Sequence, residues 1–302
     1  MTVTVKTRVP ATSANLGPGF DCLGLALQFG DEYTAAVTAT AGVRVEVSGV
    51  GAGTVPSDER NLLAKSVLHV YGRLGIPAPG LLLTAQNRIP HGRGMGSSGA
   101  AIVGGVKLAT GLLAATGVTV SPQQQLQFAT EIEGHPDNVA PGLYGGLTVS
   151  WMEGKTAHAE QLTVHPDVAP LVLVPDFEVA TKVARSLQPQ QVPHQDAVFN
   201  VSRTALLLVA LTAKPELLFA ATADKLHQDY RGPAMPMTHQ LVQQLREAGY
   251  AAVVSGAGPS VLVLGENAER RAAAAQFVTE CAPTWEQKIL AVAAHGATVE
   301  EV

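Results

Sequence analysis

Residues 90–100 form the stretch that most constrains this chain, and they read Pro-His-Gly-Arg-Gly-Met-Gly-Ser-Ser-Gly-Ala. Glycine lets a backbone turn tightly and bring successive N–H groups around one point, where an anion can bind. An Ala/Gly/Val-rich run follows, and a helix that begins near Ser97 would add the positive end of its dipole. The stretch therefore predicts an anion site, with phosphate as the expected ligand.

Two other glycine-rich patterns compete for this loop. Gly94–Gly99 fits the dinucleotide pattern G-x-G-x-x-G, which needs a preceding strand and an acidic residue about 20 positions later. The first carboxylate after the loop is Glu131, and residues 87–90 are not a clean strand. A P-loop needs a lysine directly after its last glycine, but the next lysine is Lys107. For this loop taken alone, a turn that only lets a helix pack closely is a further alternative.

The composition bounds the class of protein. A chain of 302 residues is long enough for one large or two moderate domains, and its net charge of −5 disfavours nucleic acid or an anionic membrane as the main partner. Cys22 and Cys281 lie far apart, which indicates neither a disulfide framework nor a zinc site. The N-terminus alternates like a strand and lacks an apolar signal core. We expect a soluble, cytoplasmic protein without a membrane span.

Hydrophobic periodicity and turn signals predict a mixture of strands and helices without a regular βαβ order. The helix after Ser121 has the clearest start, because Ser121, Pro122 and Gln124 form a capping-box pattern, and it ends at Gly134. This mixture predicts an α+β fold in two lobes, which we divide into residues 1–160 and 161–302. The predicted strands are 2–9, 33–39, 43–48, 81–85, 146–151, 170–174, 250–255, 260–264 and 288–294, and the predicted helices are 60–74, 97–115, 121–133, 197–213, 215–228, 236–248 and 268–281.

Two further turn-rich segments change the reading of the first loop. Residues 10–21 read Pro-Ala-Thr-Ser-Ala-Asn-Leu-Gly-Pro-Gly-Phe-Asp, and residues 255–260 read Ser-Gly-Ala-Gly-Pro-Ser. With the loop at 90–100, and in this order, they resemble the GHMP kinase superfamily. The fuller form of each segment is similar to the homoserine kinase family. Residues 133–141 and 181–185 extend the resemblance, so that five ordered motifs cover nearly the whole chain.

The resemblance implies a fold and a nucleotide site. The fold has an N-terminal lobe like domain 2 of ribosomal protein S5 and a C-terminal ferredoxin-like α/β sandwich. Ser98 would hold Mg²⁺ with a glutamate of the next helix. We choose Glu131 over Glu133 for this role, because Glu133 sits at the helix end. The alternative is that Glu131 only faces solvent. The residues that we expect to bind ATP are Asn61, Pro90, His91, Gly92, Arg93, Gly94, Met95, Gly96, Ser97, Ser98, Gly99 and Ala100.

The acceptor site implied by the resemblance uses the other motifs. Asp137 would bind an amino group, Asn138 would lie where the acceptor hydroxyl meets the γ-phosphate, and bidentate arginines would bind a carboxylate. Nothing around Lys6 supports a lysine base, so Asp21 and Asn138 are expected to act by positioning. A metal at His135 and Asp137 is an alternative. The residues expected to bind substrate are Asn15, Asp21, His135, Asp137, Thr181, Arg185, Arg231, Gly256 and Gly258.

The resemblance therefore implies an ATP-dependent kinase that phosphorylates the hydroxyl of L-homoserine in threonine biosynthesis. Another GHMP-type small-molecule kinase is the first alternative, although its substrates would lack the α-amino group that Asp21 and Asp137 suit. A non-catalytic sensor of a nucleotide or an amino acid is the second. A homodimer is what the family implies about assembly.

Overall fold

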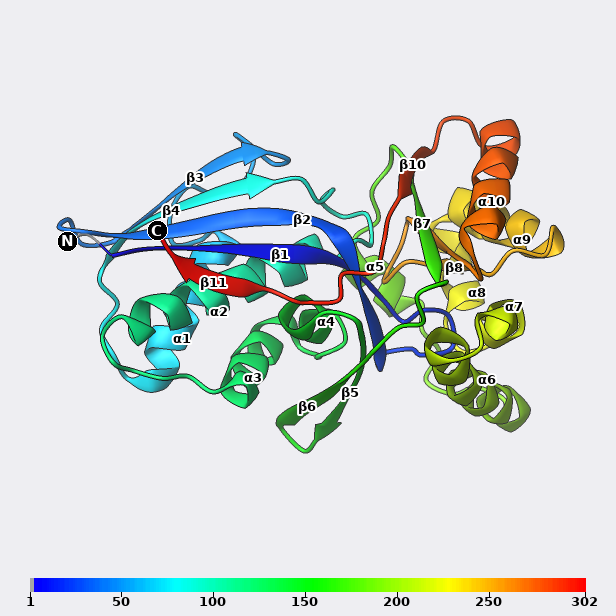
Figure 1. The fold of residues 1–302 in the computed structure, drawn as a ribbon, viewed down its shortest axis with the longest axis horizontal. Coiled ribbons are helices and arrows are strands. Elements are labelled where there is room, and N and C mark those ends of the chain that lie inside the picture. Colours follow the sequence, from blue (N-terminus) through cyan, green and yellow to red (C-terminus); the bar gives the residue numbers. More distant parts are fainter. Residues whose placement is uncertain (1–2) are drawn as a thin grey trace.

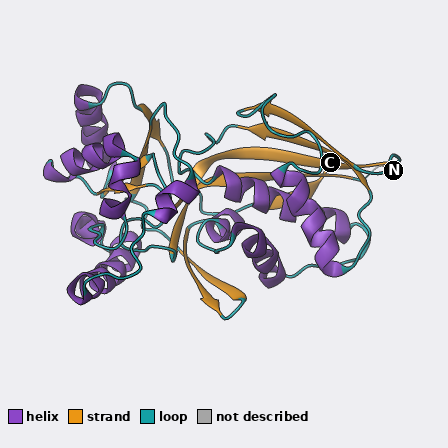
Figure 2. Ribbon diagram, turned by 180° about the vertical axis from the view of Figure 1, so that it is seen from behind, coloured by secondary structure: helices purple, strands orange, loops and turns teal. Residues whose placement is uncertain are grey.

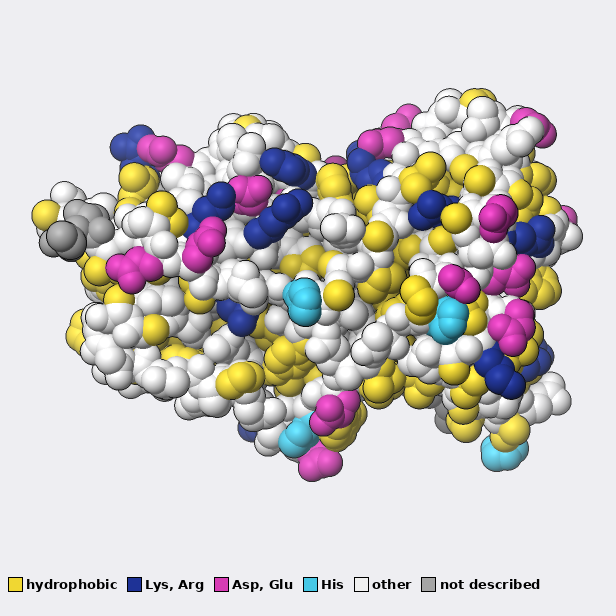
Figure 3. All heavy atoms as spheres, in the orientation of Figure 1, with side chains coloured by type: hydrophobic (Ala, Val, Ile, Leu, Met, Phe, Trp, Pro, Cys, Tyr) yellow, Lys and Arg dark blue, Asp and Glu magenta, His cyan; other side chains and the backbone are white. Residues whose placement is uncertain are grey.

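The computed structural model describes residues 3–302, apart from the side chain of Thr181. Its strands form a seven-stranded and a four-stranded sheet, which lie in two halves of the molecule joined at a narrower middle (Figure 1). The predicted α+β class is confirmed. On the face shown in Figure 3, basic and acidic side chains are interspersed, and the surface narrows where the two halves meet.

The first sheet has the order β11-β1-β2-β4-β3, and β5 and β6 extend it from β2 as a hairpin. All its pairings are antiparallel except that of β3 with β4. Because β11 pairs with β1, the end of the chain returns to the sheet where it began, and the two termini lie at the same end of the molecule (Figure 1). The strands are β1 Thr4–Ala14, β2 Leu23–Thr38, β3 Val43–Gly49, β4 Gly80–Asn87, β5 Leu147–Glu153, β6 Thr156–Leu162 and β11 Thr298–Glu301.

Helices cover one face of this sheet (Figure 2). The central one, α2, is long and apolar enough to cross a membrane, but 67% of it is buried inside the protein, as expected for a core helix. Its glycines permit this packing, because a Cβ atom on Gly104 would collide with the ring of Tyr33. Ser121 and Gln124 form the predicted capping box at the start of α3. The helices are α1 Leu62–Leu74, α2 Ser97–Ala114, α3 Pro122–Glu133 and α4 Val139–Tyr144.

The second sheet is antiparallel, with the order β10-β7-β9-β8, and it has its own core against α9 and α10. The short helix α5 lies at the junction between the two halves in both ribbon views. The strands are β7 Ala169–Val174, β8 Ala252–Val254, β9 Val261–Gly265 and β10 Glu286–Ile289. The helices are α5 Thr181–Ser186, α6 His194–Thr212, α7 Leu218–Ala221, α8 Gln228–Arg231, α9 Pro236–Glu247 and α10 Ala268–Cys281, with 3₁₀ turns at Pro215–Leu217 and Gly232–Ala234.

Some elements differ from the expectation. The predicted helix over 215–228 is broken, because the carboxylate of Asp224 accepts hydrogen bonds from the backbone N–H groups of residues 226–228 and so competes with helical pairing. The last predicted strand, 288–294, corresponds to β10, which begins at Glu286 and ends at Ile289. The division at residue 160 stays a prediction; β6 runs to Leu162, and β11 lies in the first sheet.

Candidate active site

The loop between β4 and α2 has the backbone that an anion site needs. Gly92, Gly94 and Gly96 have φ values of 62°, 69° and 75°, in the left-handed region that other residues adopt only with strain. Gly96 is the N-cap of the 18-residue helix α2, so the first N–H groups of this helix follow the loop directly. Unpaired first-turn N–H groups and the helix dipole favour a bound anion at this point.

The three glycine-containing segments meet around this loop. The Ser255 hydroxyl donates to the carbonyl of Gly94 (2.6 Å) and lies 2.9 Å from the hydroxyl of Ser13. The N–H of Thr12 donates to the carbonyl of Met95 (3.1 Å). A Cβ atom on Gly94 would collide with the Ser255 carbonyl. Segments far apart in the sequence thus hold the loop from both halves of the molecule.

Three of the residues predicted to bind ATP, namely Arg93, Met95 and Ala100, make their contacts within the protein. Arg93 donates from Nε to the carbonyl of Phe177 (3.0 Å) and from Nη2 to that of Asp176 (2.9 Å), so its side chain reaches the other half of the molecule. Met95 is fully buried. The N–H of Ala100 donates to Gly96 within the helix (2.8 Å), which leaves it unavailable to a ligand.

An apolar cavity of about 330 Å³ opens beside the start of α2. Asn61 lines it, but its side chain is already engaged: Oδ1 accepts from the N–H of Leu63 (2.9 Å) and Nδ2 donates to the carbonyl of Pro56 (2.7 Å). Asn61 therefore shapes the cavity by capping α1. A cavity of about 450 Å³ near Gly146 includes none of the predicted site residues. The walls of the smaller cavity include Tyr33, Val47, Val55, Pro56, Leu62, Ala85, His91, Ser97, Ser98 and Ala101.

Ser98 faces Glu133, not the predicted Glu131. The Ser98 hydroxyl donates to Oε2 of Glu133 (3.3 Å). Glu131 instead lies 2.8 Å from His69 and 3.2 Å from Arg73. Residues two positions apart on a helix point roughly 200° apart around its axis, so only one of the two glutamates can face α2. Burial raises the pKa of Glu133, and Asp137 adds to the shift, against the opposing effects of His135, Ser98 and Arg185.

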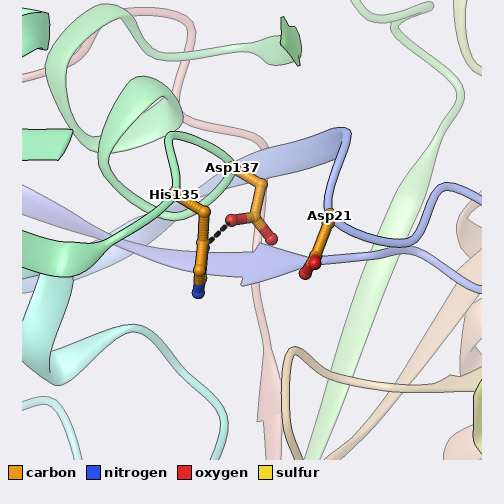
Figure 4. A group of neighbouring side chains, drawn as sticks. All are labelled: Asp21, His135 and Asp137. Atoms are coloured by element: carbon orange, nitrogen blue, oxygen red, sulfur yellow. Dashed lines mark hydrogen bonds and ion pairs between the residues drawn. The ribbon is translucent and has the colours of Figure 1, made fainter. Parts of the chain in front are cut away.

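The second cluster of polar groups lies just beyond Glu133. Asp21 follows β1, and His135 and Asp137 lie in the turn before α4, with their side chains around one space (Figure 4). Nδ1 of His135 is hydrogen-bonded to Asp137, which is buried. Arg185 of α5 donates from Nη2 to Asp21 (2.9 Å) and from the same atom to Nε2 of His135 (2.6 Å). The structure thus brings together four residues predicted to bind substrate.

Positive charge already present in this cluster disfavours a metal ion there. One ligand atom from each of Asp21, His135 and Asp137 lies within 4.8 Å of the others, as a metal site would require. The guanidinium of Arg185, however, already contacts two of the three. Burial opposes a charged imidazole, but the hydrogen bond and charge of Asp137 outweigh it and raise the pKa of His135.

Asn138 lies between this cluster and the glycine-rich loop at residues 90–96, which we call the phosphate loop after its predicted ligand. It is the N-cap of α4, and its Oδ1 accepts from the hydroxyl of Thr12 (3.4 Å). A Cβ atom on Gly99 of α2 would lie 3.5 Å from the Cβ atom of Asn138, an ordinary contact distance. The predicted acceptor site is therefore adjacent to the start of α2.

Asn15, Arg231 and Gly256 form a buried link beneath the site. Asn15 donates from Nδ2 to the carbonyl of Gly256 (2.8 Å), and Arg231 donates to the same carbonyl (3.2 Å). Oδ1 of Asn15 accepts from the N–H of Asp21 (3.0 Å), so Asn15 supports Asp21 from behind. Burial lowers the pKa of Arg231, with opposing contributions from Asp21 and other nearby carboxylates.

We call Asp21, His135, Asp137 and Arg185 the acceptor cluster; the remaining residues predicted to bind substrate are not part of it. Gly256 and Gly258 pack against Gly94, beside the phosphate loop. Thr181 begins α5, but its side chain lies outside the described part of the structure.

A buried carboxylate that no sequence motif predicts, Asp31, lies under the phosphate loop. Asp31 accepts hydrogen bonds from the N–H groups of Arg88 (2.6 Å) and Ile89 (2.9 Å) and from the hydroxyl of Tyr33 (2.9 Å). It therefore holds the point where the chain leaves β4 for the loop. Glu32 directly follows Asp31, and the local sequence does not show which of the two carboxylates is buried.

Comparisons with known proteins agree with this geometry. Residues 61–146 match the family model "GHMP kinases N terminal domain", and residues 207–284 match "GHMP kinases C terminal". A homoserine kinase of Clavibacter michiganensis subsp. michiganensis is 58% identical over 299 residues, which cover 99% of this chain and 94% of that protein. One from Leifsonia xyli subsp. xyli is 54% identical, with 99% and 92% covered.

A solved structure shares the fold along the whole chain. The homoserine kinase of Cytophaga hutchinsonii superposes with a TM-score of 0.86 at 28% sequence identity, covering 98% of this chain and 97% of that one. The two-lobed GHMP kinase fold predicted from the sequence is thereby confirmed. Both the sequence identities and the fold lead to one assignment: the chain belongs to the homoserine kinase family of the GHMP kinases.

Proposed function

We propose that this protein transfers the γ-phosphoryl group of ATP to the side-chain hydroxyl of L-homoserine and so supplies O-phospho-L-homoserine for threonine biosynthesis. The observation that carries the proposal is the adjacency of a phosphate loop and a charged cluster suited to an amino acid. Ser98 at the start of α2 contacts Glu133, and the turn that follows Glu133 carries His135, Asp137 and Asn138. Membership of the homoserine kinase family supports the same reaction.

The nucleotide fits the first of these two sites. The adenine would occupy the apolar cavity beside Asn61, and the phosphates would reach the N–H groups that follow Gly96. The hydroxyl of Ser98 and the partly buried carboxylate of Glu133 are hard oxygen donors that suit Mg²⁺, which takes few protein ligands. Bound there, Mg²⁺ would neutralise charge on the phosphate oxygens.

The acceptor fits the second site. The α-ammonium of L-homoserine would lie among Asp21, His135 and Asp137, and its α-carboxylate would meet Arg185, with Arg231 at the same end. Arg185 and Asp21 form an ion pair with each other in this structure. The same two groups would pair with the opposite charges of an amino acid, Arg185 with its carboxylate and Asp21 with its ammonium. Charge-assisted, bidentate hydrogen bonds of this kind favour a zwitterion over a neutral alcohol.

Phosphoryl transfer depends mainly on positioning and on stabilising the charge of the phosphoryl oxygens. Asn138 lies where it can hold the acceptor hydroxyl in line with the phosphate loop. The carboxylate of Asp21 accepts from Arg185, and its backbone N–H donates to Oδ1 of Asn15; both contacts suit a group that orients the substrate. We therefore assign Asn138 and Asp21 to positioning, without a strong base.

Release of ADP with four acceptors tests the activity. We expect kcat/KM for L-homoserine to exceed the values for L-serine, mevalonate and galactose by roughly a hundredfold or more, because only L-homoserine has both the charges and the chain length. Phosphorus NMR of the product should show a phosphomonoester on homoserine. Equal or higher turnover of mevalonate or galactose would point to another GHMP-type kinase. Binding of ATP and homoserine without any turnover would point to a sensor.

Asp21→Asn separates positioning from base catalysis. A positioning role raises KM for L-homoserine, while kcat at saturating substrate stays within about tenfold. A near-total loss of kcat with an unchanged KM would instead assign Asp21 as the base.

A homodimer and a cytoplasmic location stay predictions. Light scattering on the purified protein would determine its assembly.

A further inference from the structure

The turn from Asn15 to Asp21 has a strained backbone. Asn15, Leu16 and Asp21 have φ values of 71°, 50° and 54°, and they are the non-glycine residues with positive φ in the described chain, residues 3–302. Asn and Asp tolerate this left-handed region better than other side chains, but leucine does not, so the conformation of Leu16 persists only where the surroundings hold it. The turn that presents Asp21 to the acceptor site therefore needs support.

That support comes from the other half of the molecule. The carbonyl of Gly17 accepts a hydrogen bond from Nε2 of His227 (2.7 Å). The carbonyl of Pro18 accepts from Nδ2 of Asn200 (3.2 Å) and lies 2.8 Å from the hydroxyl of Thr204, which shares its proton between this carbonyl and that of Asn200 (2.8 Å). Asn200 and Thr204 lie on α6, and His227 directly precedes α8. Two successive carbonyls of the turn are thus held by three side-chain donors.

Two of the three donors, Asn200 and His227, are themselves fixed by one buried carboxylate. Asp224 accepts from Nδ2 of Asn200 (3.1 Å) and from the backbone N–H of His227 (3.0 Å). Oδ1 of Asn200 accepts from the N–H of Lys225 (2.8 Å). Asn200 and His227 are almost completely buried, so bulk water does not compete for these hydrogen bonds.

The ring of His227 adds a second contact to the turn. It stacks on Phe20 at a centroid distance of 5.0 Å and an interplanar angle of 24°. The guanidinium of Arg231 lies 5.0 Å from the centroid of the same Phe20 ring. Because Phe20 directly precedes Asp21, the ring and the hydrogen bond of His227 act on both sides of the strained turn.

We propose that Asn200, Thr204 and His227 are positioning residues, which hold the Asn15–Asp21 turn and so set the affinity for the acceptor. None of them lines the cavity assigned to the nucleotide or contacts the phosphate loop. Loss of one donor therefore weakens acceptor binding and leaves nucleotide binding unchanged. The inference rests on the proposed function only for the identity of the acceptor.

Thr204→Val is the sharpest test, because valine keeps the shape of threonine and removes the donor. Thr212→Val is the matched control, since the Thr212 hydroxyl lies on the same helix and donates only to the carbonyl of Leu208 (2.6 Å). We expect Thr204→Val to raise KM for L-homoserine about threefold to tenfold. KM for ATP should stay within about twofold in both variants, and Thr212→Val should match the wild type.

Two substitutions of His227 separate its hydrogen bond from its ring. Gln can place a donor near Nε2 without an aromatic ring, whereas Phe keeps the stacking on Phe20 and has no donor. We expect His227→Phe to raise KM for L-homoserine roughly tenfold or more, because a buried carbonyl loses its partner, and His227→Gln to restore most of the affinity. Equal effects of Gln and Phe would contradict a role for the hydrogen bond.

Hydrogen exchange provides a readout that does not depend on activity. The amides of residues 15–23 should exchange faster in Thr204→Val than in the wild type or in Thr212→Val, with or without turnover of homoserine. If the wild type fails to phosphorylate homoserine, the proposed function is wrong, and exchange still decides whether these donors hold the turn. Unchanged exchange in Thr204→Val, or an equal rise in KM for ATP and homoserine, would overturn the inference.

Discussion

The phosphate loop and the acceptor cluster lie side by side but differ in the groups that they present to a ligand. At residues 92–96 the chain offers backbone N–H groups between left-handed glycines, and the long side chain of Arg93 points away to the carbonyls of Asp176 and Phe177. At the acceptor cluster the ligand would meet charged side chains, namely Asp21, His135, Asp137 and Arg185.

This difference predicts different sensitivities. A site made of backbone groups is damaged by an added Cβ atom that moves the chain, whereas most changes of side-chain chemistry leave it intact. A site made of paired charges is damaged by removing one partner, because the other is left without compensation. The variants below should therefore alter the kinetic constants for ATP and for the acceptor separately.

Glu133 is the carboxylate where the two regions meet, and its substitution should have the largest effect. Glu133→Gln keeps the size of the side chain but removes the charge that faces Ser98. We expect kcat/KM to fall roughly 10²–10³-fold, the loss typical of removing one electrostatic stabiliser of a transition state. Glu131→Gln is the matched control, because Glu131 pairs with His69 and Arg73. An equal loss in Glu131→Gln would restore the assignment predicted from the sequence.

Gly96→Ala tests whether the phosphate loop depends on its backbone. The new Cβ atom would meet the Thr12 hydroxyl, and Gly96 has a φ of 75°. We expect KM for ATP to rise roughly tenfold to a hundredfold, while KM for L-homoserine changes little. Gly117→Ala provides the control, because Gly117 has a similar φ of 84° but no atom within 4 Å of the added Cβ. A similar rise in KM in both variants would show that close packing at Gly96 is unimportant.

Arg185→Met makes the opposite test at the acceptor cluster. It removes the hydrogen bonds to Asp21 and His135 while keeping an unbranched side chain. We expect KM for L-homoserine to rise about tenfold and KM for ATP to stay unchanged. Lys182→Met removes one positive charge from an exposed position of the same helix and should leave both constants near the wild-type values. A rise in KM for ATP alone would contradict the assignment of Arg185 to acceptor binding.

The sequence predicted much of the fold because long periodic segments carry strong signals. The helices over α1, α2, α3, α9 and α10 were predicted within about two residues. The short elements α4, α5 and β11 were not predicted. They have only four to six residues each, and β11 exists through its pairing with β1, nearly 300 positions earlier in the chain. Such pairing depends on tertiary structure and leaves little local pattern.

The candidate site was predictable to a similar degree. The motifs identified the residues that gather at the site, because each has a recognisable turn or glycine pattern. They did not show which way each side chain points. Glu131 and Glu133 lie two residues apart on one helix, and only the orientation of α3 against α2 decides which of them reaches Ser98. Likewise, Arg93 has the charge expected near phosphate but contacts the opposite half of the molecule.

Asp31 gives the smallest and most specific prediction, because its buried carboxyl group accepts hydrogen bonds from the backbone where the phosphate loop begins. Burial raises the pKa of Asp31 above its ordinary value of about 3.8, against the effects of the hydrogen bonds from Arg88, Ile89 and Tyr33 and of nearby His91. The folded state therefore binds this proton more tightly than the unfolded chain does. The stabilisation is complete below the unfolded pKa and is lost as pH rises through the folded pKa.

Asp31→Asn removes the titratable carboxyl group. Urea unfolding of both proteins at several pH values therefore gives the contribution of Asp31 to the free energy of unfolding. Acidification from pH 7 should increase the free energy of unfolding of the wild type relative to Asp31→Asn. Asp58→Asn is a control of opposite sign, because Arg60 lowers the pKa of the exposed Asp58, so that the stabilisation from Asp58 is lost on acidification. If the difference between the wild type and Asp31→Asn stayed constant with pH, folding would leave the pKa of Asp31 unchanged. The hydrogen bonds that its carboxylate accepts from the N–H groups of Arg88 and Ile89 would then fully offset the cost of burying the charge.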